Sequence, residues 1–273
     1  MKLTFKEAFL KKHPKYERVI LYMNEAFGEN ALWSNMTKIN LITFVELLCD
    51  KMAQSSARTY CAMVKSVLNM YNEEVNIPCK SYDSILNVKN VRSTNTWLTE
   101  EELERLISYE PPDELHRIIR NQFVLGCFTG ARHSDFMRFD ATNIVGEQLV
   151  YVSKKTHIQA TVPLKPIALK YLNEPMKEYS DPTFNTAIRE ICQSVNITER
   201  VKLFKAGNEV SGEKWEFISS HSARRSFATN LYLREADLYS ISKMMGHSST
   251  GMTEGYVCCG LRNQSDNVMG YFK

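Results

Sequence analysis

Long apolar runs are absent from this 273-residue chain, because no stretch of about 18 consecutive apolar residues occurs. The N-terminus, MKLTFKEAFLKKH, also lacks the apolar core of a secretory signal. These two absences argue against a membrane-spanning protein and against a secreted one. The sequence therefore predicts a cytoplasmic protein.

Cysteine pairs and metal-ligand spacings are also missing. The seven cysteines fall at irregular positions, only Cys258 and Cys259 are neighbours, and no Cys-x-x-Cys motif occurs. Such usage indicates free thiols in a reducing compartment. We expect no metal site and no cofactor.

The excess of positive charge is small, at a net +3, but it is unevenly spread. Residues 1–95 contain 13 Lys and Arg against 9 Asp and Glu, a net charge of +4, which leaves −1 for the remainder. A mildly basic N-terminal part is compatible with binding a phosphate backbone. Surface solubility explains the same excess about as well, so the charge alone does not decide.

The length fits two globular domains, and the composition, 44% hydrophobic and 24% charged, is that of an ordinary globular protein. Apolar residues recur at helical spacing behind expected caps at Thr37 and Ser55, and Ile77-Pro78 stops the second pattern. We expect a domain of four or five helices over residues 1–92 and a polar linker over 93–98.

The second expected domain, residues 99–273, opens with a strong helix start, the capping box Thr99–Glu102. Further on, Thr129-Gly-Ala-Arg132 places a glycine turn before a new helix, so that Arg132 points above the helix N-terminus. There it binds an anion such as phosphate, or it forms a surface ion pair with Asp135. Both interpretations stay open at this point.

The one convincing β pattern is a predicted hairpin. Two β-rich runs, 148–153 and 159–163, are joined by residues 154–158. Because neighbouring side chains of a strand lie on opposite faces, we expect only one of Lys154 and Lys155 to face a ligand. The remaining expectations are helices over 164–173 and 183–196 and a surface loop over 207–216.

The stretch from His221 to Tyr256 concentrates side chains that can perform chemistry. Its apolar spacing predicts two helices broken at residues 235–237, with Asp237 capping the second. Gly246 ends that helix, and a turn rich in Ser, Thr and Gly leads on to the tyrosine. His247 therefore lies just past a helix end.

Each of these residues also has an ordinary structural interpretation. Tyr256 alone is most simply a packing residue, and His247 alone a partner of the last helix carbonyls. Arg224 and Arg225 are most simply a solvated helix face. The joint order, His-x-x-Arg, then Gly-His, then a tyrosine nine residues later, favours a functional site.

Three segments carry a resemblance to a known family. They are His221-Ser-Ala-Arg224-Arg225-Ser-Phe-Ala-Thr229, Met245-Gly-His247-Ser-Ser249 and Thr253-Glu-Gly-Tyr256. They resemble the C-terminal signature of the tyrosine recombinases, the phage-integrase-like site-specific DNA recombinases. Ala223, Arg225 and Met245 depart from the usual Leu, His and Leu, at positions that the family does not use for catalysis. Thr129-Gly-Ala-Arg132-His-Ser-Asp135 and Lys155-Thr156 are similar to two further family motifs.

The resemblance implies a mainly α fold with a small β-hairpin or sheet. A helical, SAM-like core-binding domain would precede a mixed α/β catalytic domain, with no room for the arm-binding domain that many phage and transposon integrases add. The implied activity is cleavage and rejoining of DNA strands through a 3′-phosphotyrosyl intermediate. The implied partners are a double-stranded recombination site, three further copies in a tetramer and accessory DNA-bending proteins, in the bacterial cytoplasm at the nucleoid.

The residue types themselves fit attack on a phosphodiester. Negative charge grows on the non-bridging oxygens during attack on phosphorus, and the guanidiniums of Arg132 and Arg224 suit it through permanently charged, bidentate contacts. Tyr256 is the expected nucleophile. Its reference pKa of about 10 means that it needs help to lose a proton near neutrality.

Three other side chains fit the proton transfers. His221 can accept the tyrosine proton while His247 supports the phosphate or the attacking oxygen. The departing 5′-oxygen is a poor leaving group unless it is protonated. We expect Lys155 to be that acid, because it directly precedes Thr as in the family's hairpin, and Lys154 is its competitor.

Two other functions fit parts of the sequence. Type IB topoisomerases share the covalent chemistry but relax supercoils through a single nick; the small helical N-terminal domain and the Gly-His-Ser-Ser form favour recombination. A DNA-binding module without cleavage is the second, and the presence of all six candidate positions argues against it. The tail, residues 260–273, closes with an apolar cluster at 268–272 that either folds back on its own domain or docks on a neighbouring subunit.

Overall fold

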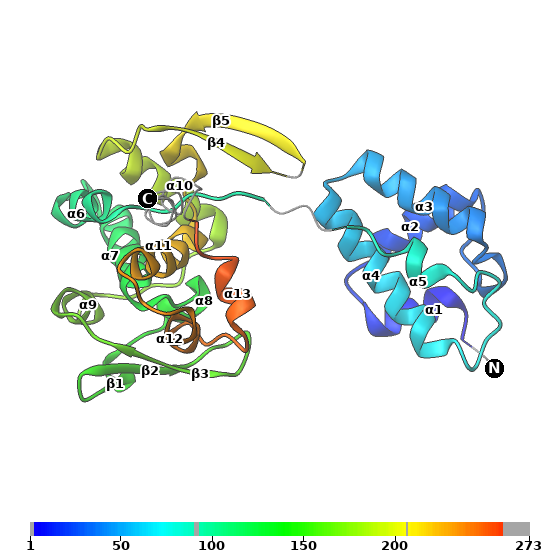
Figure 1. Cartoon of the computed structure of the whole chain (residues 1–273), viewed down its shortest axis with the longest axis horizontal. Coiled ribbons are helices and arrows are strands. Elements are labelled where there is room, and N and C mark those ends of the chain that lie inside the picture. The colour runs from blue at the N-terminus through cyan, green and yellow to red at the C-terminus, as the bar shows by residue number, and fades with distance from the viewer. Residues whose placement is uncertain (1–2, 90–92, 206, 259–273) are drawn as a thin grey trace, which may run out of the picture. The chain divides into compact units, whose positions relative to one another are not determined.

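The computed structural model describes residues 3–89, 93–205 and 207–258. The chain divides into two compact units (Figure 1). The first contains residues 1–93 together with 204–209, and the second contains 94–203 and the residues from 210 on. Each unit has its own hydrophobic core.

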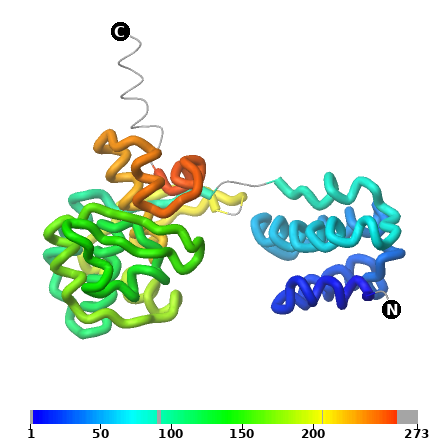
Figure 2. The backbone as a smooth tube through the Cα atoms, turned by 90° about the horizontal axis from the view of Figure 1, so that it is seen from below, coloured from blue at the N-terminus to red at the C-terminus, as the bar shows by residue number. Residues whose placement is uncertain are grey.

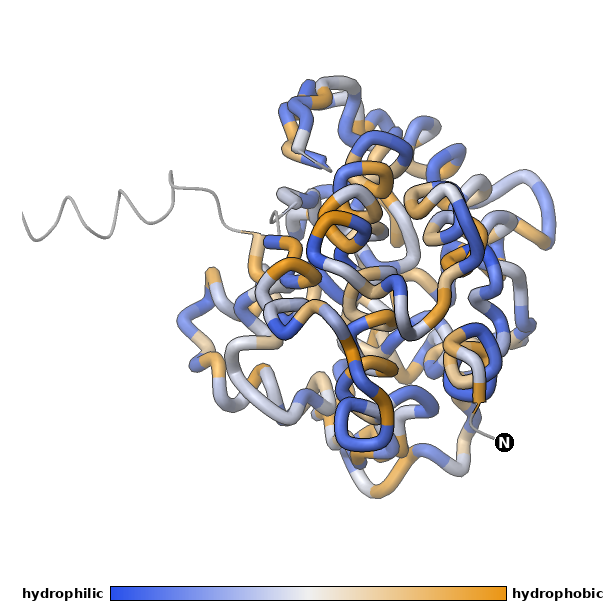
Figure 3. Tube along the Cα trace, turned by 90° about the vertical axis from the view of Figure 1, so that its right-hand side faces the viewer, coloured by the Kyte–Doolittle hydropathy of each residue, from blue (hydrophilic) through white to orange (hydrophobic). Residues whose placement is uncertain are grey.

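The first unit is helical. Its elements are α1 (Phe5–Lys12), α2 (Glu17–Phe27), the 3₁₀ turn η1 (Trp33–Asn35), α3 (Lys38–Lys51), α4 (Gln54–Tyr71) and α5 (Tyr82–Ile85). Thr4 and Glu7 form a capping box at α1, and Thr37 caps α3 as expected by accepting from the Asn40 N–H. Each helix turns an apolar stripe inward, so hydrophobic and hydrophilic stretches alternate within single turns (Figure 3).

One expected helix boundary in this unit is wrong. The N-cap of α4 is Ala53, without a side-chain bond, and Ser55 lies inside the first turn rather than before it. The helix ends at Tyr71, ahead of the expected stop at Ile77-Pro78. Buried positions such as Ala57, packed in the core, set the start of the helix more strongly than the local cap signal does.

The second unit surrounds one buried helix. Its elements are α6 (Glu100–Ser108), α7 (Glu114–Thr129), α8 (His133–Phe136), η2 (Ala141–Asn143), β1 (Ile144–Val145), β2 (Gln148–Val152), β3 (Gln159–Pro163), α9 (Pro166–Leu172), α10 (Asp181–Ser194), β4 (Arg200–Lys205), β5 (Asn208–Glu213), η3 (Lys214–Phe217), α11 (Ser220–Leu233), α12 (Leu238–Met244) and α13 (Thr250–Glu254). The end of β4 and the start of β5, within residues 204–209, are counted with the first unit. Residues 118–127 of α7 are all buried, as in a helix enclosed by others. Its neighbours include α9, α10 and α11. The expected capping box Thr99–Glu102 starts α6.

The predicted hairpin is confirmed and is part of a three-stranded sheet. Strands β2 and β3 pair antiparallel, with Tyr151 opposite Ala160, and the short β1 pairs with β2 on its other side. Leu149, Tyr151, Ala160 and Val162 are buried, so alternate residues enter the core. The sheet forms one side of this unit, and α12 packs against its strand β3 (Figures 1 and 2).

The surface loop expected over 207–216 is wrong. Residues 208–213 form β5, which pairs with β4 in a second, two-stranded sheet. Only Leu203 of β4 and Gly212 of β5 are buried in this hairpin. Because its remaining side chains face solvent at least in part, no apolar alternation marks the strands in the sequence.

The C-terminal helices follow the predicted break. Helix α11 ends at Leu233, and Asp237 caps α12 by accepting from the Ser240 N–H at 2.8 Å. Gly246 follows α12 with a φ of +61°, the left-handed conformation that glycine adopts without strain. The segment expected to be a turn is instead the short helix α13. None of the described helices is long and apolar enough to cross a membrane.

Candidate active site

Arg132 lies at the turn between α7 and α8. Gly130 ends α7 with a φ of +64°, and Arg132 is the N-cap residue of α8, as predicted. Its Nη1 donates to Ser153 Oγ at 2.9 Å, and that hydroxyl donates to Asp135 Oδ2 at 3.0 Å. The alternative of a direct Arg132–Asp135 ion pair is therefore wrong, since a serine hydroxyl joins the two side chains. Asp135 also accepts the backbone N–H of Lys154 at 2.9 Å, which ties the hairpin to α8.

Arg224 of α11 is the most deeply buried cation of the site, with 1% of its surface exposed. It donates to the carbonyl oxygens of Gly130 and Met245, the latter at 2.6 Å. Loss of hydration lowers the pKa of Arg224, and the positive charge of Arg132 lowers it further. The two arginines thus repel each other at a site enclosed by protein.

His247 is buried beside Arg224, with 4% of its surface exposed. Its Nε2 lies 2.6 Å from Arg224 Nη2 and its Nδ1 lies 2.9 Å from Thr253 Oγ1. Because a guanidinium can only donate, Nε2 must accept, so the imidazole is neutral with its proton on Nδ1. Loss of hydration, followed by the charges of Arg224 and Arg132, lowers the pKa of His247 to about 4.

Tyr256 lies against the same two groups. The Arg224 guanidinium lies 5.2 Å from the centre of its ring, and the His247 ring centre is also 5.2 Å away at an interplanar angle of 32°. Its backbone N–H donates to the Thr253 carbonyl at 2.8 Å. Helix α13 therefore carries both the hydroxyl that fixes His247 and the turn that places the tyrosine.

Tyr151 is a further residue near the arginine pair, and the sequence did not predict it as part of the site. It is 5% exposed on β2, and loss of hydration raises its pKa to about 12 even though Arg224 and Arg132 act against that rise. Its hydroxyl thus belongs to the surroundings of the arginine pair. Its only signal in the sequence is its place in an alternating strand, and that alternation predicts burial rather than proximity to Arg132 and Arg224, which lie 19 and 73 residues away in the sequence.

Lys155 and His221 lie exposed at the edge of this cluster. Loss of hydration lowers the pKa of His221, followed by the charge of Arg225, and Lys155 is among the cations that lower it further. Lys154 and Lys155 both lie in the turn after β2, which ends at Val152. Strand alternation therefore cannot decide which of the two lysines faces a ligand. The prediction treated them as strand residues, whereas they lie in a turn.

Four of the six predicted residues, Arg132, Arg224, His247 and Tyr256, thus gather around one point, with the other two beside it. In the part of the chain that the structure describes, no group of three or more His, Cys, Asp and Glu side chains is arranged to hold a metal ion. With two buried guanidiniums and a neutral histidine, the cluster is suited to an anion.

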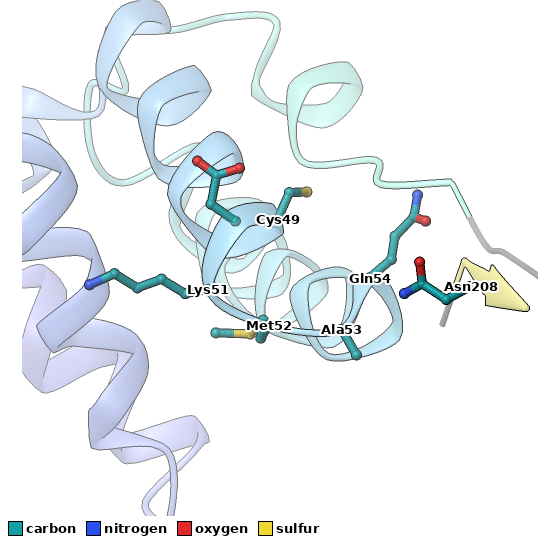
Figure 4. Close-up of a pocket in the computed structure, with 7 residues that line it drawn as sticks. Cys49, Lys51, Met52, Ala53, Gln54 and Asn208 are labelled. Carbon is teal, nitrogen blue, oxygen red and sulfur yellow. The ribbon is translucent and has the colours of Figure 1, made fainter. Parts of the chain in front are cut away.

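A pocket in the first unit is unrelated to this cluster. Figure 4 shows it at the turn between α3 and α4, where residues 49–54 and Asn208 line it. None of the six predicted residues is among them. The pocket carries none of the chemistry described above.

Comparison with known proteins places the chain in a family. Residues 96–259, more than half of the chain, match the phage integrase family. The chain belongs to the phage integrase family. It is accordingly a site-specific tyrosine recombinase, an enzyme of DNA strand exchange.

Individual relatives agree with this assignment. The chain is 25% identical over 248 residues to tyrosine recombinase XerD of Oceanobacillus iheyensis, covering 86% of this chain and 82% of that protein. It is 26% identical over 253 residues to tyrosine recombinase XerC of Natranaerobius thermophilus, with the same coverages.

Solved structures share the fold at lower identity. A lambda integrase dimer bound to a COC′ core site superposes with a TM-score of 0.66 at 16% identity, covering 90% of this chain and 88% of that one. A lambda integrase tetramer bound to a Holliday junction gives 0.61 at 17% identity, covering 93% and 77%. The predicted fold class, mainly α with small sheets, is confirmed.

Proposed function

We propose that Tyr256 attacks a DNA phosphodiester held by Arg132 and Arg224. The observation that carries this proposal is the pair of buried, mutually repelling guanidiniums with the Tyr256 ring against one of them. A phosphate between the two arginines would relieve their repulsion and would lie beside the phenol. Attack forms the bond from Tyr256 Oη to phosphorus and breaks the bond from phosphorus to the 5′-oxygen.

The proton transfers fall to the residues at the edge. His221 accepts the phenol proton, and its lowered pKa leaves it neutral and able to do so near neutrality. Lys155 protonates the departing 5′-oxygen. This assignment is supported by the position of Lys155 near the site, since its charge lowers the pKa of His221. Neutral His247 holds the Arg224 guanidinium at one nitrogen and packs on the nucleophile's ring.

Rejoining reverses these steps. The 3′-phosphotyrosyl bond keeps the energy of the phosphodiester, so a 5′-hydroxyl from another strand can displace Tyr256 without a separate energy source. Two duplexes have four strands to break and each chain offers one Tyr256. We therefore propose that four protomers assemble on two DNA sites, as in the lambda integrase tetramer on a Holliday junction.

The two units divide the work in this proposal. The first, mildly basic unit binds the DNA as a core-binding domain, and the second unit cuts and rejoins it. The partner is double-stranded DNA with its recombination site, and accessory DNA-bending proteins join the complex. The two named relatives are bacterial, which supports placing the reaction in a bacterial cytoplasm.

A nicked duplex that carries the recombination site tests the nucleophile. A nick releases the short 5′-hydroxyl strand after cleavage, so the wild-type protein should remain joined to DNA in a denaturing gel. Tyr256→Phe should bind the same duplex in a gel shift and give no joined product. A joined product from Tyr256→Phe contradicts the assignment, and wild-type binding without any joined product favours a non-catalytic DNA-binding protein.

A further inference from the structure

One face of α10 binds the segment that leads into α11. Asp181, Asn185 and Arg189 are spaced four residues apart and so lie on the same face of that helix. Asn185 Oδ1 accepts the backbone N–H of Ser220 at 2.8 Å, and Arg189 Nε donates to the Ile218 carbonyl at 2.9 Å. The Ser220 hydroxyl donates to Asp181 Oδ1 at 3.5 Å. The next residue of α11 is His221.

The same carboxylate reaches the other side of the site. Asp181 Oδ1 lies 2.7 Å from Nδ1 of His133, which directly follows Arg132. The His133 ring is held between Phe184 of α10, at 4.4 Å between ring centres, and Phe136, at 5.4 Å. Helix α10 is therefore hydrogen-bonded to α11, which carries the proposed proton acceptor His221, and to α8, whose N-cap is the proposed phosphate ligand Arg132.

We infer that Asp181, Asn185 and Arg189 are positioning residues for the strand-cleavage reaction, and that the Asp181 carboxylate supplies the negative charge that keeps His221 basic. This inference rests on the function proposed above, in which His221 accepts the proton of Tyr256. None of the three belongs to the motifs that carried the sequence resemblance.

The charges that face His221 support this role. Arg224 and Arg225 face it from α11 and Lys155 from the turn after β2, and each lowers the pKa of His221. Loss of hydration lowers it further and is the largest cause. Asp181, from α10, is the one group named among these charges that raises the pKa. Removing the charge of Asp181 therefore leaves, among these groups, only cations that lower the pKa of His221.

The test measures the rate of joined-product formation on the nicked duplex as a function of pH. A general base is active when deprotonated, so the acid limb of this profile reports the pKa of His221. Asp181→Asn keeps an oxygen for His133 and Ser220 but removes the charge, so the limb should move to lower pH. Glu190→Gln removes a charge from the same helix at a residue bonded to His116, and it should leave the limb unchanged.

A second variant should move the limb the other way. Asn185→Asp keeps an acceptor for the Ser220 N–H and adds a negative charge one residue from His221, so the limb should move to higher pH. Asn185→Ala removes the acceptor without adding charge, so the plateau rate should fall about tenfold while the limb stays in place. A merely structural role would not move the limb in opposite directions.

The outcomes separate the two proposals. If the wild-type protein forms no joined product, the proposed function fails. If it does, but the Asp181→Asn and Asn185→Asp limbs coincide with the wild-type limb, the positioning inference is wrong. Thermal melting of each variant identifies any that fails to fold, and because two variants predict opposite shifts, the loss of one leaves the other to decide.

Discussion

At the scale of single residues, the two buried arginines, Arg132 and Arg224, suit the site to an anion. Arg224 donates hydrogen bonds to two carbonyl oxygens and to His247, and Arg132 donates one to a serine hydroxyl. Neither touches a carboxylate directly in the described part of the chain. Burying two cations without direct counterions costs folding free energy, and an anionic ligand offsets that cost.

The leaving-group acid can be identified chemically. Lys155→Ala should slow cleavage by roughly a hundredfold or more, because the 5′-oxygen leaves poorly without a proton. A substrate with sulfur at the 5′ bridging position should restore the rate, since a thiolate leaves without one. Rates of joined-product formation on the two substrates measure the effect.

Lys154→Ala is the matched control for this experiment. It changes the neighbouring side chain of the same turn and keeps the backbone N–H that Asp135 accepts. We expect a nearly normal rate on both substrates. Sulfur rescue of Lys154→Ala in place of Lys155→Ala would move the assignment by one residue.

His247 should make the stability of the fold sensitive to acid. Its pKa is about 4 in the folded protein and about 6.5 in an unfolded chain. Between these values the unfolded chain binds a proton that the folded protein excludes, so stability present above pH 6.5 is lost as the pH falls toward 4. From pH 7 to pH 5 the wild-type protein should lose roughly 2 kcal/mol more than His247→Gln.

Denaturant unfolding at the two pH values measures this difference. His157→Gln, a change at an exposed histidine in the hairpin, is the control and should keep the wild-type dependence. Equal losses in wild type and His247→Gln would mean that His247 is not held neutral by its surroundings.

The sequence predicted the residues of the site better than their contacts. Short motifs named Arg132, Arg224, His247 and Tyr256, because each motif is local in the chain. The Ser153 bridge and the place of Tyr151 were not predicted, since they join residues about twenty to seventy positions apart. Such pairings depend on how β2 packs on the helices, which no local spacing encodes. The catalytic roles of the six residues stay predictions.

At the scale of elements, the turn at Gly130 fixes two parts of the site at once. Its left-handed backbone ends α7, its carbonyl accepts from Arg224, and a Cβ there would overlap the Phe227 ring of α11. Gly130→Ala should therefore cost about 3 kcal/mol of unfolding free energy, from backbone strain and overpacking together, and should displace the helix that carries Arg224.

Gly146→Ala separates the two contributions. Gly146 has nearly the same φ, +61°, but nothing lies within 4 Å of an added Cβ. It should cost only about 1 kcal/mol, the strain of the left-handed backbone. Equal losses for the two variants, measured by denaturant unfolding, would show that the Phe227 contact does not matter.

Elements with strong local signals were predicted well. Capping at Thr99 and Asp237 and the alternation of β2 and β3 agree with the structure. The β4–β5 hairpin was missed because its exposed strands carry few apolar residues, and α13 was missed because Ser, Thr and Gly favour a turn. In α13 the fully buried Thr253 contributes a tertiary contact that its local sequence does not reveal.

At the scale of the whole molecule, the proposed assembly of four protomers requires contacts between them. The apolar cluster at residues 268–272 was the predicted means, and it lies outside the described residues. If the tail docks on a neighbouring subunit, deletion of residues 268–273 should leave binding to a single half-site nearly intact. Cooperative filling of paired half-sites should then disappear in a gel-shift titration.

The opposite results have a clear meaning. Cooperativity that survives the deletion contradicts docking between subunits. A large fall in melting temperature of the truncated protein indicates instead that the tail folds on its own domain. The assembly test therefore distinguishes the two placements that the sequence left open.

The most direct measurement identifies the residue joined to DNA. Wild-type protein is trapped on a nicked duplex that carries its recombination site, digested with nuclease and protease, and examined by mass spectrometry. We predict a nucleotide attached through its 3′-phosphate to the phenol oxygen of Tyr256. A nucleotide on any other side chain, or attachment through a 5′-phosphate, would contradict the catalytic assignment.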